Sequence, residues 1–331
     1  MSGDDNQIPS ALVAVGTKVL AVRSATLIKR GLALVESLQS GDADAHHNLG
    51  IALYLKGDLD GAIAEYRTAL RLQPDDARAH TSLGGALEEK GDLDGAIAEY
   101  REALRLIPNS ELTHYYLGIA LKGKGDLEGA IEEYCTAIRL QPDYAATHYN
   151  LGAALYAKGD LDGAIAEYRT AIRLDPDDAD VHHDLGVALH DKFDLDGAIA
   201  EYREALRLNP ENELAHVCHG AALGTKGDLD GAIAEYREAL RLNPKNEKAH
   251  VGLGVTLGYK GHWDGAISEY REVLRLNPKV DLAHYWLGMA LEEKGDLRGA
   301  LEEFRAAHML DPNDAEYKQN YERLLQQVNQ R

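Results

Sequence analysis

The sequence predicts an all-α protein in which a row of similar helix pairs packs into one elongated solenoid. The chain repeats itself every 34 residues from Ala43 to Asp314, and eight copies follow one another without a gap. Each copy carries start and stop signals for two short helices, and the second helix shows one apolar stripe. A unit this short cannot bury its apolar face alone, so it must pack against its neighbours.

The copies divide the chain into three parts. They are aligned on a Leu-Gly pair or its equivalent and begin at Ala43, Ala77, Glu111, Ala145, Ala179, Glu213, Glu247 and Asp281. Length alone would favour two or three globular domains, but units that share one core override that expectation. We therefore predict an N-terminal helical cap over residues 1–42, eight repeats over residues 43–314 and a C-terminal capping helix over residues 315–331.

The second copy shows how each helix pair is delimited. Its first helix is expected over residues 77–90, and Gly91 ends it because glycine readily takes the left-handed conformation of a helix C-terminus. Asp92 can cap the second helix, expected over residues 93–106, and Pro108 separates the pair from the next copy. Apolar residues of that helix recur mostly at spacings of three and four: Leu93, Ala96, Ile97, Tyr100, Ala103, Leu104 and Leu106.

The N-terminal segment is strongly apolar over residues 11–38, but Lys18, Arg23, Lys29 and Arg30 interrupt it. No uncharged stretch reaches the roughly 20 residues that a membrane-spanning helix needs. The acidic start of the chain also disfavours a signal peptide. We expect a degenerate helix pair that caps the solenoid, while a dimer contact or a peripheral membrane anchor stays open, since a basic amphipathic helix can serve either use.

The C-terminal segment keeps helical spacing in its apolar residues, which are Tyr317, Tyr321, Leu324, Leu325 and Val328. We expect one helix that covers the last copy, as terminal capping units do.

The recurring positions resemble the tetratricopeptide repeat (TPR). In the fourth copy the matching residues are Leu151, Gly152, Ala164, Tyr168, Ala171 and Pro176, and a proline closes all eight copies. The resemblance covers most of the chain and implies a right-handed superhelical TPR solenoid of antiparallel helix pairs, whose first helices line a concave face. The departures are His219 for leucine, Phe193 for the turn glycine, Val273 for the late alanine, and histidine where the family usually has tryptophan.

Composition narrows the class of partner and the compartment. The formal net charge is −20, from 35 basic and 55 acidic residues, and no Lys/Arg cluster of the kind that binds nucleic acid is present. Much of the acidity lies in the turns, in Asp-Leu-Asp and Pro-Asp-Asp stretches, which is typical of a solvated surface, with attraction of a basic partner as the alternative. Cys135 and Cys218 lie in the third and sixth copies, too far apart in a linear solenoid for a disulfide. Nothing indicates secretion, so we expect a cytoplasmic protein.

No motif with a catalytic mechanism is found: the sequence has no phosphate-binding loop, no H-E-x-x-H, no C-x-x-C and no G-x-S-x-G. We therefore predict no catalytic residue, no cofactor and no enzyme activity.

Position 4 of every copy is histidine: His46, His80, His114, His148, His182, His216, His250 and His284. Packed helices lie about 8–10 Å apart, so adjacent members of this row cannot easily share one zinc ion. We interpret these histidines as packing residues in the aromatic slot of the family, each with one ring nitrogen hydrogen-bonded.

Two local clusters keep metal binding open as an alternative. The first is His216, Cys218 and His219, and the second is His183, Asp184 and His190. Neither supplies a recognised full set of ligands, so no metal site is predicted.

Variation among the copies indicates where a ligand would bind. The segment Asp-Leu-Asp-Gly-Ala-Ile-Ala-Glu-Tyr-Arg recurs unchanged in the second helix of copies one, two, four, five and six, whereas the first helices vary at positions 5 and 6. The resemblance places these varied positions on the concave face. A constant scaffold with a varied groove suggests a binding surface, and the alternative is that exposed positions simply drift.

The third and fourth copies supply the candidate groove, which consists of Tyr115, Tyr116, Ile119, Lys122, Tyr149, Asn150 and Tyr156. Tyrosines are common anchors at protein interfaces. We expect Asn150 to bond the main chain of a bound protein segment and Lys122 to meet a carboxylate. The alternative is that the tyrosines only stabilise contacts between helices.

Two known binding modes of the family do not match this chain. The carboxylate clamp of co-chaperones would fall on residues of the first three copies that lack its pattern, namely His47, Ile51, Ser82, Leu112 and Tyr116. An asparagine ladder would need asparagine at position 6 throughout, and only Asn48 and Asn150 provide it.

We therefore predict a non-enzymatic protein–protein interaction scaffold or assembly adaptor that binds a protein or peptide segment, with no nucleic acid partner and no integral membrane segment. Two alternatives are a regulatory or targeting subunit of a separate enzyme and a self-assembling structural protein that associates through its N-terminal helix or its end repeats. The near-identity of the copies would also suit recent duplication or a consensus-like design.

Overall fold

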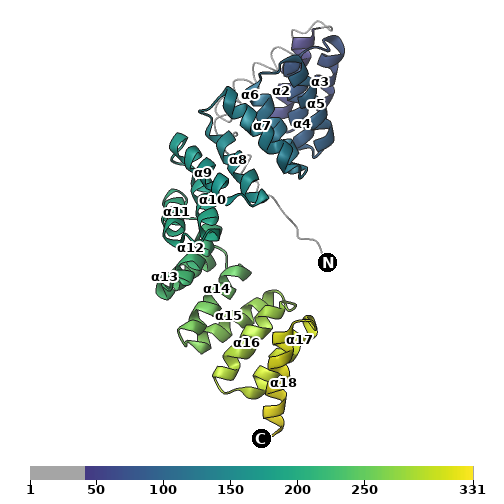
Figure 1. Ribbon diagram of the computed structural model, residues 1–331. Helices are drawn as coiled ribbons and strands as arrows, with labels where there is room; N and C mark the ends of the chain where they lie inside the picture. Colours follow the sequence, from purple (N-terminus) through teal and green to yellow (C-terminus); the bar gives the residue numbers. More distant parts are fainter. Residues whose placement is uncertain (1–41, 331) are drawn as a thin grey trace. The chain divides into compact units, whose positions relative to one another are not determined.

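The computed structural model describes residues 42–330, which form seventeen α-helices and no strand (Figure 1). The predicted all-α solenoid of helix pairs is confirmed. The chain divides into two compact units at the boundary between Lys158 and Gly159. The N-terminal cap expected over residues 1–42, with its suggested roles in dimerisation or membrane contact, falls almost wholly outside the described residues.

Helices of the first unit are α2 (Ala43–Leu55), α3 (Leu59–Leu72), α4 (Ala77–Glu89), α5 (Leu93–Leu106), α6 (Glu111–Gly123), α7 (Leu127–Leu140) and α8 (Ala145–Lys158). Those of the second unit are α9 (Leu161–Leu174), α10 (Ala179–Asp191), α11 (Leu195–Leu208), α12 (Glu213–Lys226), α13 (Leu229–Leu242), α14 (Glu247–Tyr259), α15 (Trp263–Leu276), α16 (Asp281–Glu293), α17 (Leu297–Leu310) and α18 (Ala315–Asn329). Each even-numbered helix from α2 to α16 is the first helix of one copy. Among the described residues, no helix has both the length and the apolar character to cross a membrane.

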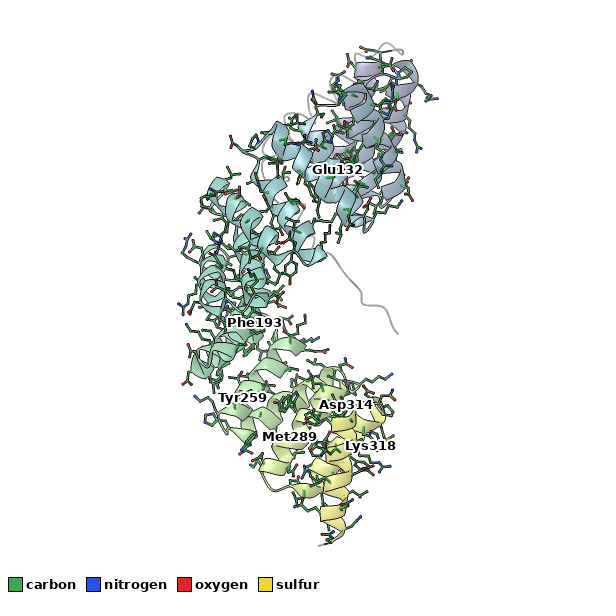
Figure 2. All side chains as sticks on the ribbon, in the orientation of Figure 1. Glu132, Phe193, Tyr259, Met289, Asp314 and Lys318 are labelled. Atoms are coloured by element: carbon green, nitrogen blue, oxygen red, sulfur yellow. The ribbon has the colours of Figure 1, made fainter. Side chains whose placement is uncertain are left out.

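A short turn joins the two helices of each pair. In the second copy Gly91 has a φ of 86°, and Oδ1 of Asp92 accepts a hydrogen bond of 2.9 Å from the main-chain nitrogen of Gly95. The left-handed residue and the aspartate cap are therefore the stop and start signals that the sequence shows. The fifth copy is unlike the others, because the bulky Phe193 takes the left-handed conformation with a φ of 60° and leaves its ring 82% exposed (Figure 2).

In seven of the eight pairs, a tyrosine or phenylalanine of the second helix packs against a glycine of the first. Tyr100 of α5 is fully buried, and its ring lies so close to Gly84 of α4 that a Cβ atom there would be 2.6 Å from Cε1 of the ring. Phe304 has the same relationship to Gly288 in the last copy, with a nearest approach of 2.9 Å. The Leu-Gly pair of the repeat therefore marks the place where the second helix approaches the backbone of the first.

Six of the eight position-4 histidines use both ring nitrogens, so the expectation of one hydrogen-bonded nitrogen is wrong for these six. Nδ1 of His80 lies 2.6 Å from Oε2 of Glu99, and Nε2 lies 3.0 Å from the carbonyl oxygen of Pro74. The same two contacts recur at His114, His182, His216, His250 and His284. The ring sits between a glutamate of its own pair and the proline that ends the preceding copy, and this geometry supplies two partners.

The last helix, α18, covers the final pair of the second unit. The α18 residues Tyr317 and Leu324 are buried against that pair, with exposed fractions of 6% and 0%. The Tyr285 hydroxyl of α16 donates a hydrogen bond of 2.6 Å to Glu316, which fixes the start of α18. The apolar stripe read from the sequence thus faces the solenoid.

Candidate functional site

The seven candidate groove residues lie on two first helices of the first unit. Tyr115, Tyr116, Ile119 and Lys122 belong to α6, whereas Tyr149, Asn150 and Tyr156 belong to α8. The two helices are in contact although α7 separates them in sequence. All except Asn150 are half-buried, so they present part of their surface to solvent.

Asn150 connects the two helices through its side-chain amide. The amide nitrogen donates hydrogen bonds to the Tyr115 hydroxyl, at 3.3 Å, and to the Ala146 carbonyl oxygen, at 3.0 Å. The amide oxygen accepts a hydrogen bond of 3.0 Å from Nζ of Lys122. The structure therefore brings Tyr115, Lys122 and Asn150 together.

The burial of Asn150 changes its role. The side chain is 1% exposed, and its amide is occupied inside the protein. Instead of reaching the main chain of a ligand, as the sequence suggested, it fixes the positions of Tyr115 and Lys122. Sequence position alone could not reveal this, because the exposed fraction depends on the packing of two helices that are far apart in the chain.

Aromatic rings surround Tyr115. Its ring centroid lies 5.4 Å from that of Tyr116, 5.5 Å from Tyr144 and 6.2 Å from Tyr134, while Tyr100 stacks on Tyr116 at 6.0 Å. Burial raises the pKa of Tyr115 and Tyr116, so both hydroxyls stay protonated and neutral near pH 7. Tyr144, which is 40% exposed, joins the site although the sequence analysis did not include it, because it lies in the turn before α8.

The first unit also has an acidic residue near these tyrosines that the sequence prediction left out. Glu88 of α4 occupies the same position of its copy as Lys122, so successive first helices present a carboxylate and an ammonium group. Its Oε2 accepts a hydrogen bond of 2.8 Å from the Tyr100 hydroxyl. Burial raises the pKa of Glu88, while this hydrogen bond opposes the change. Glu88 could have been identified from the sequence, because it stands at position 12 of the second copy, as Lys122 does in the third.

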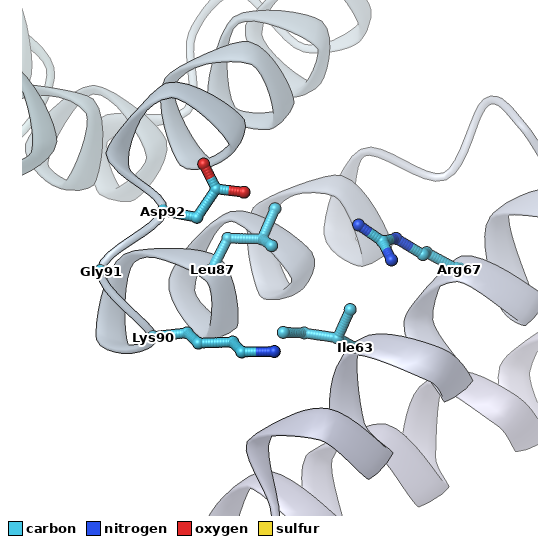
Figure 3. Close-up of a pocket in the computed structure, with 6 residues that line it drawn as sticks. All are labelled: Ile63, Arg67, Leu87, Lys90, Gly91 and Asp92. Carbon is cyan, nitrogen blue, oxygen red and sulfur yellow. The ribbon is translucent and has the colours of Figure 1, made fainter.

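Two cavities lie at the junctions between copies. One of about 360 Å³ is lined by Ile63, Arg67, Leu87, Lys90, Gly91 and Asp92 (Figure 3). A second of about 380 Å³ in the other unit is lined by residues at the same repeat positions, including Ile199, Arg203 and Leu223. Because the same shape recurs, we attribute it to the packing of successive copies. Over the described part of the chain, no group of three or more histidine, cysteine, aspartate or glutamate side chains is arranged to hold a metal ion.

Two family models match the chain over most of its length. The model described as tetratricopeptide repeat matches residues 23–77, 47–111 and 251–315. The model described as TPR repeat matches residues 121–159, 152–192, 194–227 and 224–261. A search of curated proteins found no match.

Several solved structures share the fold. YrrB, described as a TPR protein with an unusual peptide-binding site, is 22% identical, with a TM-score of 0.51, over 56% of this chain and 95% of YrrB. PilF of Pseudomonas aeruginosa is 21% identical, with a TM-score of 0.56, over 62% of this chain and 94% of its own. A tetratricopeptide repeat protein of Parabacteroides merdae is 16% identical, with a TM-score of 0.56, over 75% and 98% of the two chains.

At these identities the structures share the fold alone, and the family assignment rests on the two models together with the tandem helix pairs. Proteins built from such repeats act as protein-interaction modules, which places this chain in that general functional class. The chain belongs to the tetratricopeptide repeat family.

Proposed function

We propose that the first unit binds a segment of a partner protein over Tyr115, Tyr116, Ile119, Lys122, Tyr149 and Tyr156, and that the chain serves as a non-enzymatic scaffold or assembly adaptor. The observation that carries the proposal is the position of Lys122, whose ammonium group is held by the buried Asn150 beside a cluster of half-buried tyrosines. Aromatic anchors next to an oriented charge are typical of sites that carry most of the binding energy of an interface.

The chemistry of these residues specifies the kind of segment. Lys122 donates a hydrogen bond to Asn150, and we expect its ammonium group to meet a carboxylate of the partner. Tyr115, Tyr116 and Tyr144 offer ring surface to an apolar or aromatic side chain next to that carboxylate. The expected ligand is therefore an extended or helical segment with an acidic residue beside an apolar one.

The test uses the full chain and a display library of random peptides. We expect the selected peptides to contain an acidic residue next to an apolar or aromatic one. Lys122→Gln should weaken their binding about 10-fold, as expected for one charge-assisted hydrogen bond. Lys124→Gln is the matched control. Lys124 follows Lys122 by two residues, and its exposed side chain pairs with Asp94 instead. Equal affinity of the two variants would place the ligand outside this groove.

Two other roles are compatible with the same fold and call for different readouts. A regulatory or targeting subunit would change the activity of an enzyme that it retains, whereas a scaffold would not. A self-assembling protein would show a sedimentation coefficient that rises with protein concentration and that Lys122→Gln leaves unchanged.

A further inference from the structure

Phe193 departs from the pattern of the turns in both its backbone and its side chain. The other seven copies have a left-handed glycine at this position, namely Gly57, Gly91, Gly125, Gly159, Gly227, Gly261 and Gly295. Phe193 takes the same conformation, with a φ of 60°, although a side chain makes it unfavourable. Its ring is 82% exposed, so little of it packs against the protein (Figure 2). A strained backbone that carries an exposed aromatic ring indicates a functional reason for the residue.

The cavity of about 380 Å³ in the second unit has an apolar floor and a charged rim. Ile199 of α11 and Leu223 of α12 form the floor, and each is only 5% exposed. Exposed residues form the rim, among them Arg203 and Lys226. The volume lies in the range of about 300–1,000 Å³ that is typical of ligand sites, so an aromatic ring can enter the cavity.

The repeat places Phe193 and this cavity next to each other. Phe193 has the same position in the fifth copy that Gly227, which lines the cavity, has in the sixth. Helix α11 begins two residues after Phe193 and contributes Ile199 and Arg203 to the cavity, and both α10 and α11 are in contact with α12. A projecting ring and a cavity therefore lie on one edge of the same unit, a single copy apart.

The charges beside the ring and in the cavity complement each other. Asp194, which follows the ring, is exposed, and its Oδ1 accepts a hydrogen bond of 3.0 Å from the main-chain nitrogen of Gly197. In the cavity Lys226 pairs with Asp196, whereas Arg203 forms no hydrogen bond or ion pair with another described residue. A guanidinium group stacks on aromatic rings and binds carboxylates. Arg203 is therefore suited to a ring that is followed by an aspartate.

We propose that two copies of this chain associate through this edge, with Phe193 of each protomer inserted into the second-unit cavity of its partner. A surface that carries both a projecting ring and a matching cavity is complementary to itself, as a two-fold symmetric interface requires. In each of the two identical contacts the ring packs on Ile199 and Leu223, and Arg203 meets both the ring and the Asp194 carboxylate.

This surface differs from the N-terminal helix and the end repeats that the sequence suggests for self-association. It also contains no residue of the groove in the first unit, so Lys122→Gln should leave the dimer unchanged. Binding of a partner segment and formation of the dimer can therefore succeed or fail independently.

The first unit has an equivalent cavity, lined by Ile63, Arg67 and Leu87 among others (Figure 3). Insertion of Phe193 into that cavity would join different surfaces of the two chains, and such contacts can continue into open-ended assemblies. Exchange between two second units closes after two chains. The two arrangements therefore predict different masses and different sensitive arginines.

Sedimentation equilibrium of the full chain measures the dissociation constant of the dimer. The mass of the wild-type chain should rise with protein concentration to that of a dimer and no further. Phe193→Gly should raise the dissociation constant about 100-fold, because a loss of about 10-fold is expected at each of two identical aromatic anchors. Arg203→Glu should raise it by a similar factor, because the new carboxylate meets Asp194 of the other protomer.

Two matched controls should leave the dimer unchanged. Tyr259→Ala removes another aromatic side chain, which is 76% exposed at the end of α14 (Figure 2). Arg67→Glu changes the arginine at the same repeat position as Arg203, in the cavity of the first unit.

A mixture of the Phe193→Gly and Arg203→Glu chains separates a lost contact from a lost fold. The mixed dimer keeps one complete contact, so it should form about 10-fold more tightly than the dimer of either variant alone. Glycine takes the left-handed conformation freely. At concentrations where the wild-type chain is monomeric, Phe193→Gly should therefore melt no earlier than the wild type.

Three results would overturn the proposal. The first is a wild-type chain that stays monomeric at every concentration or associates beyond the dimer. The second is an unchanged dissociation constant in Phe193→Gly. The third is a loss of association in Arg67→Glu as large as that in Arg203→Glu.

Discussion

Nδ1 of His80 lies 2.6 Å from Oε2 of Glu99, and this contact ties the first helix of the second copy to the second helix. Nε2 of the same ring lies 3.0 Å from the carbonyl oxygen of Pro74, which belongs to the end of the preceding copy. A carbonyl oxygen only accepts, so Nε2 must carry a hydrogen atom. One imidazole therefore joins two helices of one copy to its neighbour, and the repeated histidines connect successive copies within each unit.

Glu99→Ala should lower the free energy of unfolding by about 1–2 kcal/mol, because a part-buried imidazole nitrogen loses its partner. Thermal unfolding followed by circular dichroism measures the change. Glu102→Ala is the matched control, since Glu102 forms its ion pair with Arg105 on the same helix. If the two variants melt at the same temperature, the histidine contact does not stabilise the solenoid.

The pair of His216 and Glu235 should make stability depend on pH in both directions. Burial lowers the pKa of His216, but its contacts with Glu235 and Pro210 outweigh this and raise the pKa above its usual value. That contribution is present below about pH 6.5 and is lost as the pH rises through the folded-state pKa. Burial raises the pKa of Glu235, but His216 and His219 outweigh it and lower the pKa to about 2, so this contribution is lost as the pH falls from about 4.5 towards 2.

Both contributions of this pair are therefore complete between about pH 4.5 and about pH 6.5. Melting temperatures of the wild-type chain and of Glu235→Gln measured from pH 3 to pH 9 should differ most in that window. A difference that stays constant over the whole range would show that the glutamine changes packing and not ionisation.

Gly84→Ala should destabilise the first unit by about 2 kcal/mol, because the added methyl group has no room beside the Tyr100 ring. Gly85→Ala, at the next residue of the same helix, meets only the Tyr100 hydroxyl oxygen at 3.7 Å. It should stabilise the chain by about 0.5–1 kcal/mol through its higher helix propensity. Urea unfolding of both variants measures the contrast, and an equal effect of the two alanines would contradict the packing argument.

Phe193→Gly should stabilise the second unit by about 0.5–1 kcal/mol. A left-handed conformation costs an L-residue roughly 1–2 kcal/mol, and the flexibility of glycine in the unfolded chain cancels part of the gain. The reciprocal change, Gly227→Phe, introduces the same strain in the next copy, where φ is 92°, and should lower the melting temperature. A loss of stability in Phe193→Gly would mean that the exposed ring makes contacts that compensate for its strained backbone.

Local signals made much of the fold predictable. The turn glycine, the aspartate cap and the closing proline act within a few residues, and the 34-residue period places each first helix, so the start of α6 at Glu111 and that of α8 at Ala145 could be read directly. The period also showed that Tyr115 and Asn150 belong to neighbouring first helices. The packing of those helices decides three further features. These are the hydrogen bond between Asn150 and Tyr115, the burial of Asn150, and the contact of the Tyr144 ring with that of Tyr115.

The sequence by itself determined the family, the order of the helices and the faces on which variation accumulates, because repeats and helix ends are encoded locally. Only the tertiary structure decided that six of the eight histidines in the row use both ring nitrogens and that Asn150 supports Lys122 instead of facing a ligand. The physical reason is that exposure and partner choice arise where side chains of different copies meet. Those contacts are fixed by the packing of helices that are separated by about one period in the chain.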